Sequence, residues 1–501
     1  MPFDWQSLLE QTRMGLPLIL PEVQLAFFGL AILLTDFLLD EHHKSWNALT
    51  AMLGVIFSGV SLWMLRGVPP EGIPGYNNSI VADPFFVFFG FIFLIATALV
   101  ILLSARYLEI EAEHHGEYYA LILFSAVGMM FLACGNDLIV LFLGLETMAL
   151  SFYILTGFLR HDRRSNEGAL KYVLLGAFSS GVLAYGFSIL YGISGAASGG
   201  ASTNLADIRA AVAARPSPDA LVLLALVTVA AGVFFKIAAV PFHQWAPDVY
   251  EGAPTSITAY VSVASKAASF ALVLRLFTTV FWPTRVDWTL LIAAVAVLSM
   301  TLGNIAAITQ SNIKRLLAYS SISHVGYILL GLVAGNALGM KAMLYYLLVY
   351  AFFNTGAFAI VIVLRRKGII GDQLEDLNGL IERSPGAAIL MLIFLLSLAG
   401  IPPTAGFIGK LLIFWALIET QHYVLAVLAV LYILPAVYYY FRMVAAMWAK
   451  EAPEEPRIRI SLAQGCALAA MVIATLAAGI YPEPFVQFAK YASSSLLPFI
   501  R

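Results

Sequence analysis

The sequence predicts an all-α polytopic membrane protein, on two observations. Of its 501 residues, 61% are hydrophobic and only 12% are charged, and the mean hydropathy is +0.87. An ordinary soluble domain of this length does not approach these values. The apolar residues also gather into runs long enough to cross a bilayer, which takes about 20 consecutive apolar residues. The net charge of -2 leaves no basic surface for nucleic acid, so the composition predicts the lipid bilayer as the surrounding medium.

By this length rule we count about fourteen predicted spans, with edges good to a few residues, near 18–39, 46–65, 84–104, 117–134, 138–159, 168–193, 219–240, 254–277, 287–308, 314–334, 339–364, 385–420, 423–446 and 462–481. The stretch 385–420 is too long for one straight span, and Pro402-Pro403 divides it. Proline cannot continue a helix, so we expect one discontinuous helix there and a second break near Pro241.

The basic residues of the connections predict the orientation of the chain. Links after odd-numbered spans hold fourteen of them: Lys44, Arg106, Arg160, Arg163, Arg164, Lys314, Arg315, Arg365, Arg366, Lys367, Arg383, Lys450, Arg457 and Arg459. The opposite side holds eight: Arg13, Arg66, Arg209, Arg215, Arg285, Lys341, Lys490 and Arg501. Because basic residues favour the cytoplasmic side, both termini are predicted to lie outside.

We expect one membrane domain over 1–501 that contains an internal repeat. Three helices in 1–116 precede two groups of five spans, in 117–277 and 287–446, and 447–501 holds the last helix. An odd number of spans per group inverts the second group relative to the first, as in many transporters. In each group the fourth span is broken and carries a lysine, Lys236 or Lys410. The second span of each carries an ionisable residue, Glu146 or His324.

Several ionisable residues lie within apolar runs, where a charge at the membrane centre costs about 2.5 to 3.5 kcal/mol on insertion scales. Lys266 is about twelve residues from either end of its span, or ~18 Å, which exceeds the reach of its side chain. It must therefore face protein or a hydrated cavity. Glu146 and Lys410 are similarly central, whereas Lys171 and Arg442 lie near span ends and are expected to snorkel.

A buried lysine suits proton relay because burial disfavours its ammonium form, while a nearby carboxylate favours it. His243, just past Pro241, and His324, beside three serines, are candidates to bridge such lysines. The alternative is a structural ion pair of Glu146 with Lys236. Lys236 is also close enough to a span end to snorkel. An ion pair leaves at least two of the three central lysines without an obvious carboxylate.

Cysteine usage predicts no cluster or metal site held by this chain alone. Cys134 and Cys466 are far apart in sequence and belong to no CxxC motif, so we interpret them as inert core residues.

Three motifs resemble the antiporter-like membrane subunits of respiratory complex I and the related Mrp cation/proton antiporters. They are FKIAAVPFHQWAPDVYEGAPT at 235–255, KRLLAYSSISH at 314–324 and NDLIVLFLGLE at 136–146. The first is highly specific, and the resemblance covers most of the chain. Within that group, EGALKYVLLGAFSSG at 167–181 and the fourteen spans resemble the subunit N type of NADH-quinone oxidoreductase.

This resemblance implies a proton-translocating role and assigns residues to it. Glu146 and Lys236 match the family's coupling pair, Lys266 its central lysine and Lys410 the lysine of its outward half-channel. The subunit M type carries glutamate at the position of Lys410. The resemblance also implies that NADH, FMN, iron-sulfur clusters and quinone belong to partner subunits. Other membrane subunits, especially antiporter-like ones, would be its neighbours in a bacterial cytoplasmic membrane.

Two other functions stay open at this point. An Mrp-type or free-standing sodium/proton antiporter would use an ion gradient with no redox partner. A quinone-binding enzyme would act by itself, although no GxGxxG after a strand and no cluster ligands are present in the sequence.

Overall fold

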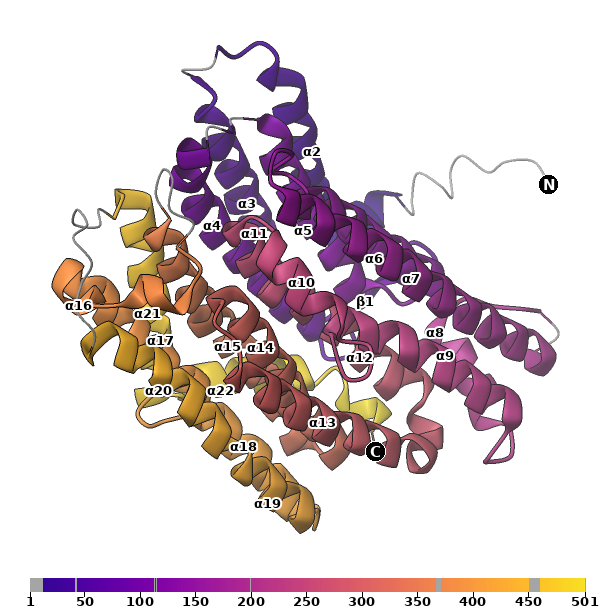
Figure 1. The fold of residues 1–501 in the computed structure, drawn as a ribbon. Helices are drawn as coiled ribbons and strands as arrows, with labels where there is room; N and C mark the ends of the chain where they lie inside the picture. The colour runs from indigo at the N-terminus through magenta and orange to yellow at the C-terminus, as the bar shows by residue number, and fades with distance from the viewer. Residues whose placement is uncertain are drawn as a thin grey trace.

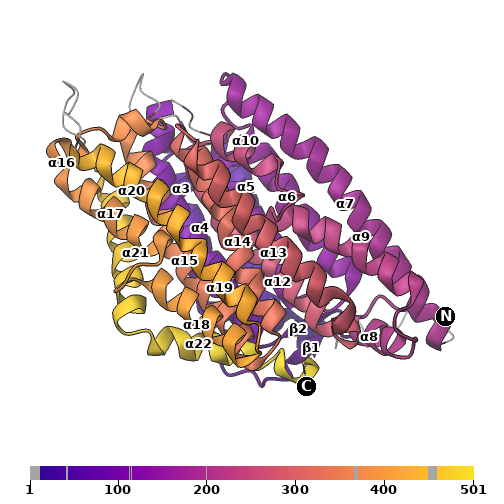
Figure 2. The same cartoon turned by 60° about the horizontal axis from the view of Figure 1, so that its bottom comes forward.

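The computed structural model describes residues 12–40, 43–111, 113, 115–198, 200–365, 371–449 and 460–500. These residues form a bundle of long helices that run side by side (Figures 1 and 2). One antiparallel hairpin, β1 (Ile73–Gly75) with β2 (Ile80–Ala82), is present in the described ranges. The early helices lie on one side of the bundle and the late helices on the other. Those near the middle of the chain lie between them.

Long helices account for most of the predicted spans. They are α2 (Leu20–Asp36), α3 (Trp46–Met64), α4 (Pro84–Glu111), α5 (Gly116–Cys134), α6 (Leu138–Thr156), α7 (Arg163–Ser198), α9 (Ala220–Ile237), α13 (Arg285–Ile308), α14 (Ile313–Ala334), α15 (Ala337–Leu364) and α21 (Leu462–Ile480). The composite span Thr255–Val280 consists of α11 (Thr255–Tyr260), η3 (Val261–Ser265), α12 (Lys266–Arg275) and η4 (Leu276–Val280), and α19 (Tyr423–Leu431) continues into α20 (Ile433–Ala449).

Short helices complete the chain: α8 (Leu205–Ala213), α10 (Trp245–Gly252), α16 (Leu380–Arg383), α17 (Pro385–Ala399), α18 (Ala405–Glu419) and α22 (Glu483–Ser493). The 3-10 turns are η1 (Leu16–Leu18), η5 (Trp282–Thr284), η6 (Leu374–Leu377) and η7 (Leu497–Phe499). Among the described residues, twelve helices are long and apolar enough to cross a membrane, and α2 with the bent turn before it makes a thirteenth. The multi-pass class is confirmed, while the count of fourteen, the inverted repeat and the domain limits stay predictions.

Both predicted helix breaks are confirmed. The helix α9 ends at Ile237, and the chain passes through Pro241 before α10 begins at Trp245. In the second break α17 ends at Ala399, and Gly400 adopts a left-handed φ of 83° before Pro402-Pro403 and α18. Glycine reaches this region without the clash that a Cβ would cause. Each break leaves the last carbonyls of a half-helix inside the bundle without helical partners.

The centre of the bundle is the composite span Thr255–Val280, in which the apolar window is 100% buried. The window in Ile313–Ala334 is 94% buried, whereas that in Tyr423–Ala449 is only 28% buried. Outer helices expose large apolar side chains such as Phe178 and Leu434, as a lipid-facing surface does. A charged group in the middle of α12 or α14 therefore has no route to lipid or bulk water along its own helix.

Three basic residues near span ends have specific polar partners. The side chain of Lys171, 42% exposed, pairs with Glu167 at 2.8 Å and Asp248 at 2.7 Å, so its predicted snorkelling stays a prediction. The guanidinium of the partly exposed Arg442 donates to the carbonyls of Ile308 and Gln310 at the end of α13. Carbonyls at a helix C-terminus lack helical partners and carry negative partial charge, so they attract cations.

Lys314, counted above as a link charge, is buried, and its Nζ donates to the Ala253 carbonyl at the end of α10 (2.8 Å). Other link residues that entered the orientation count lie outside the described ranges: Arg366, Lys367, Lys450, Arg457, Arg459 and Arg501. The orientation stays a prediction.

Candidate functional site

The three predicted central lysines all lie in the interior, each on a different element. Lys236 on α9 is 5% exposed, Lys266 on α12 is 3% exposed and Lys410 on α18 is 2% exposed. Full burial of three cations is costly in a membrane protein unless each finds polar partners. Their surroundings therefore decide what each of them can do.

Lys266 contacts uncharged polar groups. It is the first residue of α12, directly after the π-helical segment η3, and such segments often occur at functional sites. Its Nζ donates to the Ser321 carbonyl (3.3 Å) and to the Ser321 hydroxyl on α14. That hydroxyl also hydrogen-bonds the Tyr350 hydroxyl on α15 (2.7 Å). No carboxylate pairs with Lys266 in the described ranges, so hydroxyl groups are its nearest proton-exchange partners.

Lys410 is held by the helix break that precedes it. Its Nζ donates to the carbonyls of Ala399 (2.8 Å) and Leu398 (3.3 Å), which are the last residues of α17. It also lies 4.8 Å from the ring centroid of Tyr327. The negative end of the α17 dipole and the face of the ring both favour a cation. The helix break before Pro402-Pro403 thus frees the carbonyls that accept hydrogen bonds from Lys410.

Lys236 is buried and Glu146 is partly buried, and the two form no bond with each other. Neither Lys236 Nζ nor Glu146 Oε1 has a hydrogen-bond partner in the described ranges, and the two form no ion pair within 4.0 Å. The nearest rings to Lys236 Nζ are Phe235 at 5.9 Å and Tyr153 at 6.0 Å. The structural ion pair considered as an alternative is therefore not formed in this conformation. Snorkelling of Lys236 is also wrong, because its side chain is buried.

His324 is a bridge between hydroxyl groups. Its Nδ1 is 2.7 Å from the Tyr346 hydroxyl, and its Nε2 is 3.3 Å from the Tyr440 hydroxyl, which also contacts Ser320. Ser321, His324 and Tyr327 follow each other at intervals of three along α14, so they lie on one face at steps of ~4.5 Å. This face begins at the partner of Lys266 and ends at the ring beside Lys410.

His243 lies in the first break, apart from this line. The ring is half-buried, and its Nδ1 has no partner in the part of the chain that the structure describes. The structure brings it into no contact with the three lysines. Its predicted relay role stays a prediction.

Sequence reasoning missed a buried ion pair. It joins Arg275, the last residue of α12, to Asp83, the residue before α4. Arg275 donates two hydrogen bonds to the Asp83 carboxylate, of 2.7 and 2.9 Å, and both side chains are at most 4% exposed. The guanidinium also donates to the Ala133 carbonyl and lies 4.5 Å from the Phe85 ring centroid. Both charged residues stand at span ends, where the distance rule allows snorkelling. The only signal in the sequence was that the two residues carry opposite charges and that each is flanked by apolar residues.

Sequence reasoning also missed Glu22 and the tyrosines. Glu22 on α2 is 1% exposed, and its Oε1 contacts Cys134 Sγ at 3.8 Å. Tyr346, Tyr350 and Tyr440 read as aromatic core residues in sequence, because nothing local shows that their hydroxyls meet α14.

We expect Arg275→Met to destabilise the protein by about 3 to 5 kcal/mol, because it leaves the Asp83 carboxylate buried without a partner. In the parent, Asp83 accepts a hydrogen bond from the Phe86 backbone amide (2.8 Å), and Asp83→Asn keeps an oxygen that can accept this bond. The double variant Asp83→Asn/Arg275→Met should therefore recover part of the loss. Thermal unfolding in detergent measures this cycle. Additive losses in the double variant would contradict an energetic coupling between the two residues.

For His324→Ala we expect a smaller transport defect than for the lysines, since neighbouring hydroxyls and ordered water can partly replace one bridge. His324→Gln keeps hydrogen bonds to both tyrosines but cannot take up a proton, so it separates relay from packing. Proton transport per assembled complex is compared with thermal stability. A loss of stability with unchanged transport per complex would show that His324 only packs.

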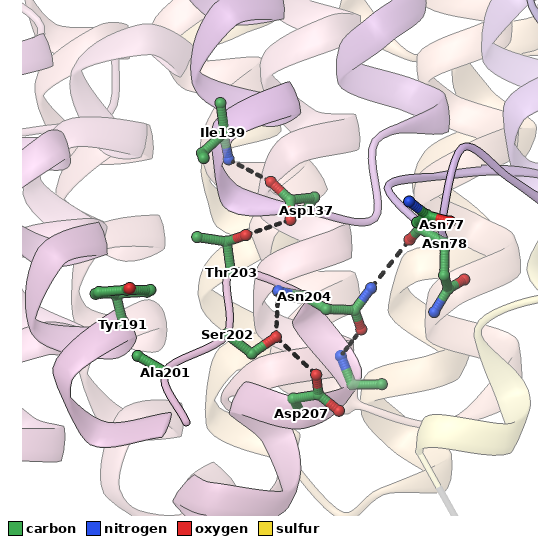
Figure 3. A pocket seen from close by; sticks show the side chains of 11 residues that line it. Asn77, Asn78, Asp137, Ile139, Tyr191, Ala201, Ser202, Thr203, Asn204 and Asp207 are labelled. Atoms are coloured by element: carbon green, nitrogen blue, oxygen red, sulfur yellow. Dashed lines mark hydrogen bonds between the residues drawn. The ribbon is translucent and has the colours of Figure 1, made fainter. Parts of the chain in front are cut away.

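A polar cavity of about 890 Å³ lies elsewhere, near the start of α6 (Figure 3). Asp137 accepts from Thr203 (2.5 Å) and from the Ile139 amide (2.8 Å), and Asn204 donates to the Asn78 carbonyl (2.9 Å). These bonds join the β1–β2 turn, the α6 N-terminus and the segment before α8. None of the three central lysines lines this cavity, so we interpret it as a junction between connections.

Comparison with known proteins places this arrangement in a family. The family model described as NADH:quinone oxidoreductase/Mrp antiporter, TM, matches residues 135–434. NADH-quinone oxidoreductase subunit N 2 of Solibacter usitatus is 56% identical over 480 residues, covering 94% of this chain and 96% of the relative. Subunit N 1 of Koribacter versatilis is 50% identical, covering 95% and 94%.

Solved structures share the fold. A chain of respiratory complex I from Thermus thermophilus with bound aureothin is 31% identical with a TM-score of 0.77, covering 93% of this chain and 98% of that one. A chain of the Mrp complex from Dietzia has a TM-score of 0.78 at 21% identity, covering 96% and 99%, and shows the fold alone. The chain therefore belongs to the NADH:quinone oxidoreductase/Mrp antiporter family of membrane proteins.

Proposed function

We propose that this chain is a proton-translocating, antiporter-like membrane subunit of NADH-quinone oxidoreductase, and that buried lysines carry its protons. The observation that supports this most is the line of polar groups along α14. Ser321, which accepts a bond from Lys266, shares one face of α14 with His324 and with Tyr327, whose ring lies beside Lys410. Ordered water would bridge the steps between these groups. A structural core would place apolar side chains there, since each buried polar group carries a desolvation cost.

The residues suit stepwise transfer. An ammonium group on Lys266 can pass a proton to the Ser321 oxygen while that hydroxyl releases its own proton to the Tyr350 oxygen. Tyr350 in turn releases its hydroxyl proton to water that would bridge to the His324 ring, whose centroid lies 5.3 Å from that of the Tyr350 ring. His324 can take up a proton at one ring nitrogen and release one at the other, because each nitrogen faces a different tyrosine hydroxyl. Lys410 then receives a proton where the α17 carbonyls stabilise its charged form.

Glu146 and Lys236 are proposed as the switch of this chain. They are unpaired in this conformation, and closer approach of the carboxylate would favour the charged lysine. No helical hydrogen bonds cross the break around Pro241, so the end of α9 could shift relative to α10 once the bond from Trp245 Nε1 to the Phe235 carbonyl (2.8 Å) opens. A change in their separation would therefore load or release a proton.

The redox chemistry is proposed to belong to partner subunits, with FMN, iron-sulfur clusters, NADH and quinone bound there. Cys134 is buried, as predicted, and contacts Glu22, but Cys466 is exposed, so its assignment to the core is wrong and the two thiols do not share a site. No group of three potential metal ligands occurs in the described ranges. Other membrane subunits of the complex are the proposed neighbours. We place the chain in the bacterial cytoplasmic membrane with both termini on the periplasmic side.

The test isolates a tagged chain from detergent-solubilised membranes and reconstitutes the eluate in liposomes. We expect NADH:quinone oxidoreductase activity in the eluate and NADH-driven proton movement across the liposome membrane. Lack of flavin and iron-sulfur subunits, together with proton flux driven by a sodium gradient, would overturn the proposal in favour of an Mrp-type antiporter. NADH oxidation with no proton movement would also overturn it.

A further inference from the structure

An apolar groove of about 630 Å³ opens on the surface between α3, α4, α15 and α22. The helix α22 lies near one end of the bundle, beside the late helices (Figure 2). Its residues Phe485 and Phe488 form one wall of the groove, and Phe91 and Ile95 of α4 and Phe352 of α15 form others. None of these residues belongs to the polar line along α14.

The groove extends about as deep as one leaflet of a bilayer. Ile95 lies eleven residues after Pro84, the first residue of α4, which corresponds to ~16 Å along the helix axis. Half the hydrocarbon thickness of a typical bilayer is about 15 Å. The groove therefore runs from the membrane surface, where α3 ends, to about the middle of the bilayer.

One cation lies at the mouth. Arg66 lies two residues after the end of α3 and is exposed, and it forms no ion pair in the described ranges. Its guanidinium lies 4.3 Å from the Trp63 ring centroid, and its backbone carbonyl accepts a hydrogen bond from the Tyr491 hydroxyl (2.7 Å). Arginine, tryptophan and tyrosine at this level are typical of the interface between lipid tails and headgroups. An amphipathic anion would match both the groove and its mouth.

The cation at the mouth favours a lipid over a helix from a neighbouring subunit. An exposed guanidinium at the level of the headgroups attracts an anionic lipid, whose tail can lie along the apolar walls. A flexible hydrocarbon chain fits, and guanidinium groups bind phosphate through paired hydrogen bonds. We propose that the groove binds an acyl chain of an anionic phospholipid whose phosphate pairs with Arg66. Such a lipid would link the N-terminal helices α3 and α4 to α22.

The test uses phosphatidylglycerol with a photoactivatable group in its acyl chain, added to the purified complex that contains the full chain. We expect labelling of the peptides that carry Ile95 and Phe352, with stronger competition by unlabelled phosphatidylglycerol than by phosphatidylcholine. Arg66→Gln should weaken competition by phosphatidylglycerol about tenfold, through loss of a charge-assisted contact. Arg106→Gln, which removes another exposed arginine, is the matched control.

A second variant tests the groove itself. Ile95→Trp should fill it and abolish labelling there, while labelling near the lipid-facing Phe178 of α7 stays unchanged and reports on folding. Three results would overturn the proposal: equal competition by the two lipids in the parent, unchanged competition in Arg66→Gln, or unchanged groove labelling in Ile95→Trp. Cross-linking of a photoreactive group at Phe91 to a neighbouring subunit would assign the groove to a protein partner instead.

Discussion

Replacement of Lys266 by alanine is expected to lower proton transport through this chain by about tenfold or more, since a positioned proton-transfer group typically contributes ~10²-fold or more. The Nζ of this lysine is the group that meets Ser321 at the start of the α14 line. Insertion and assembly should persist, because removal of a buried charge relieves a cost. The effect is measured as NADH-driven proton movement, divided by the amount of assembled complex seen on native gels.

The matched control for this variant is Lys341→Ala. Lys341 lies near the start of α15, is only partly buried and has no contact with the α14 line in the described ranges. Its replacement should leave transport at the parent rate. Full assembly of Lys266→Ala with normal proton movement would remove Lys266 from the pathway.

The second large effect is expected for Lys236, where arginine separates a fixed charge from a proton carrier. Arginine keeps the positive charge near Glu146 but does not deprotonate in a protein. Because Lys236 forms no bond with Glu146 in this conformation, no structural pair needs that charge. We expect both Lys236→Arg and Lys236→Ala to assemble and to lose most of the transport through this chain, again by about tenfold.

The larger guanidinium can also misfit, since Lys236 is packed near Phe235 and Tyr153. Assembly on native gels is therefore measured first, and Lys341→Arg is the control for the substitution type. If Lys236→Arg assembles and transports protons at the parent rate, Lys236 does not release its proton during turnover.

Local chemistry explains what could be predicted. The breaks at Pro241 and Pro402-Pro403 could be predicted because proline has no backbone N–H to donate, whatever the surrounding structure. The deep burial of Lys266 followed from its distance to both span ends. The exact span edges and the contacts of residues near span ends could not be predicted in this way. Arg442 and Lys314 turned to helix-end carbonyls, and no distance rule along one helix can foresee those contacts.

The sequence by itself determined the membrane class, the helix breaks and the lysines that must lie inside. Tertiary structure alone decided their partners. Ser321 is 55 residues from Lys266, and Asp83 is 192 residues from Arg275. The same holds for Lys236 and the partly buried Glu146, which form no pair with each other. The physical reason is that insertion and helix breaking depend on neighbouring residues, whereas hydrogen bonds and ion pairs here depend on how separate helices pack.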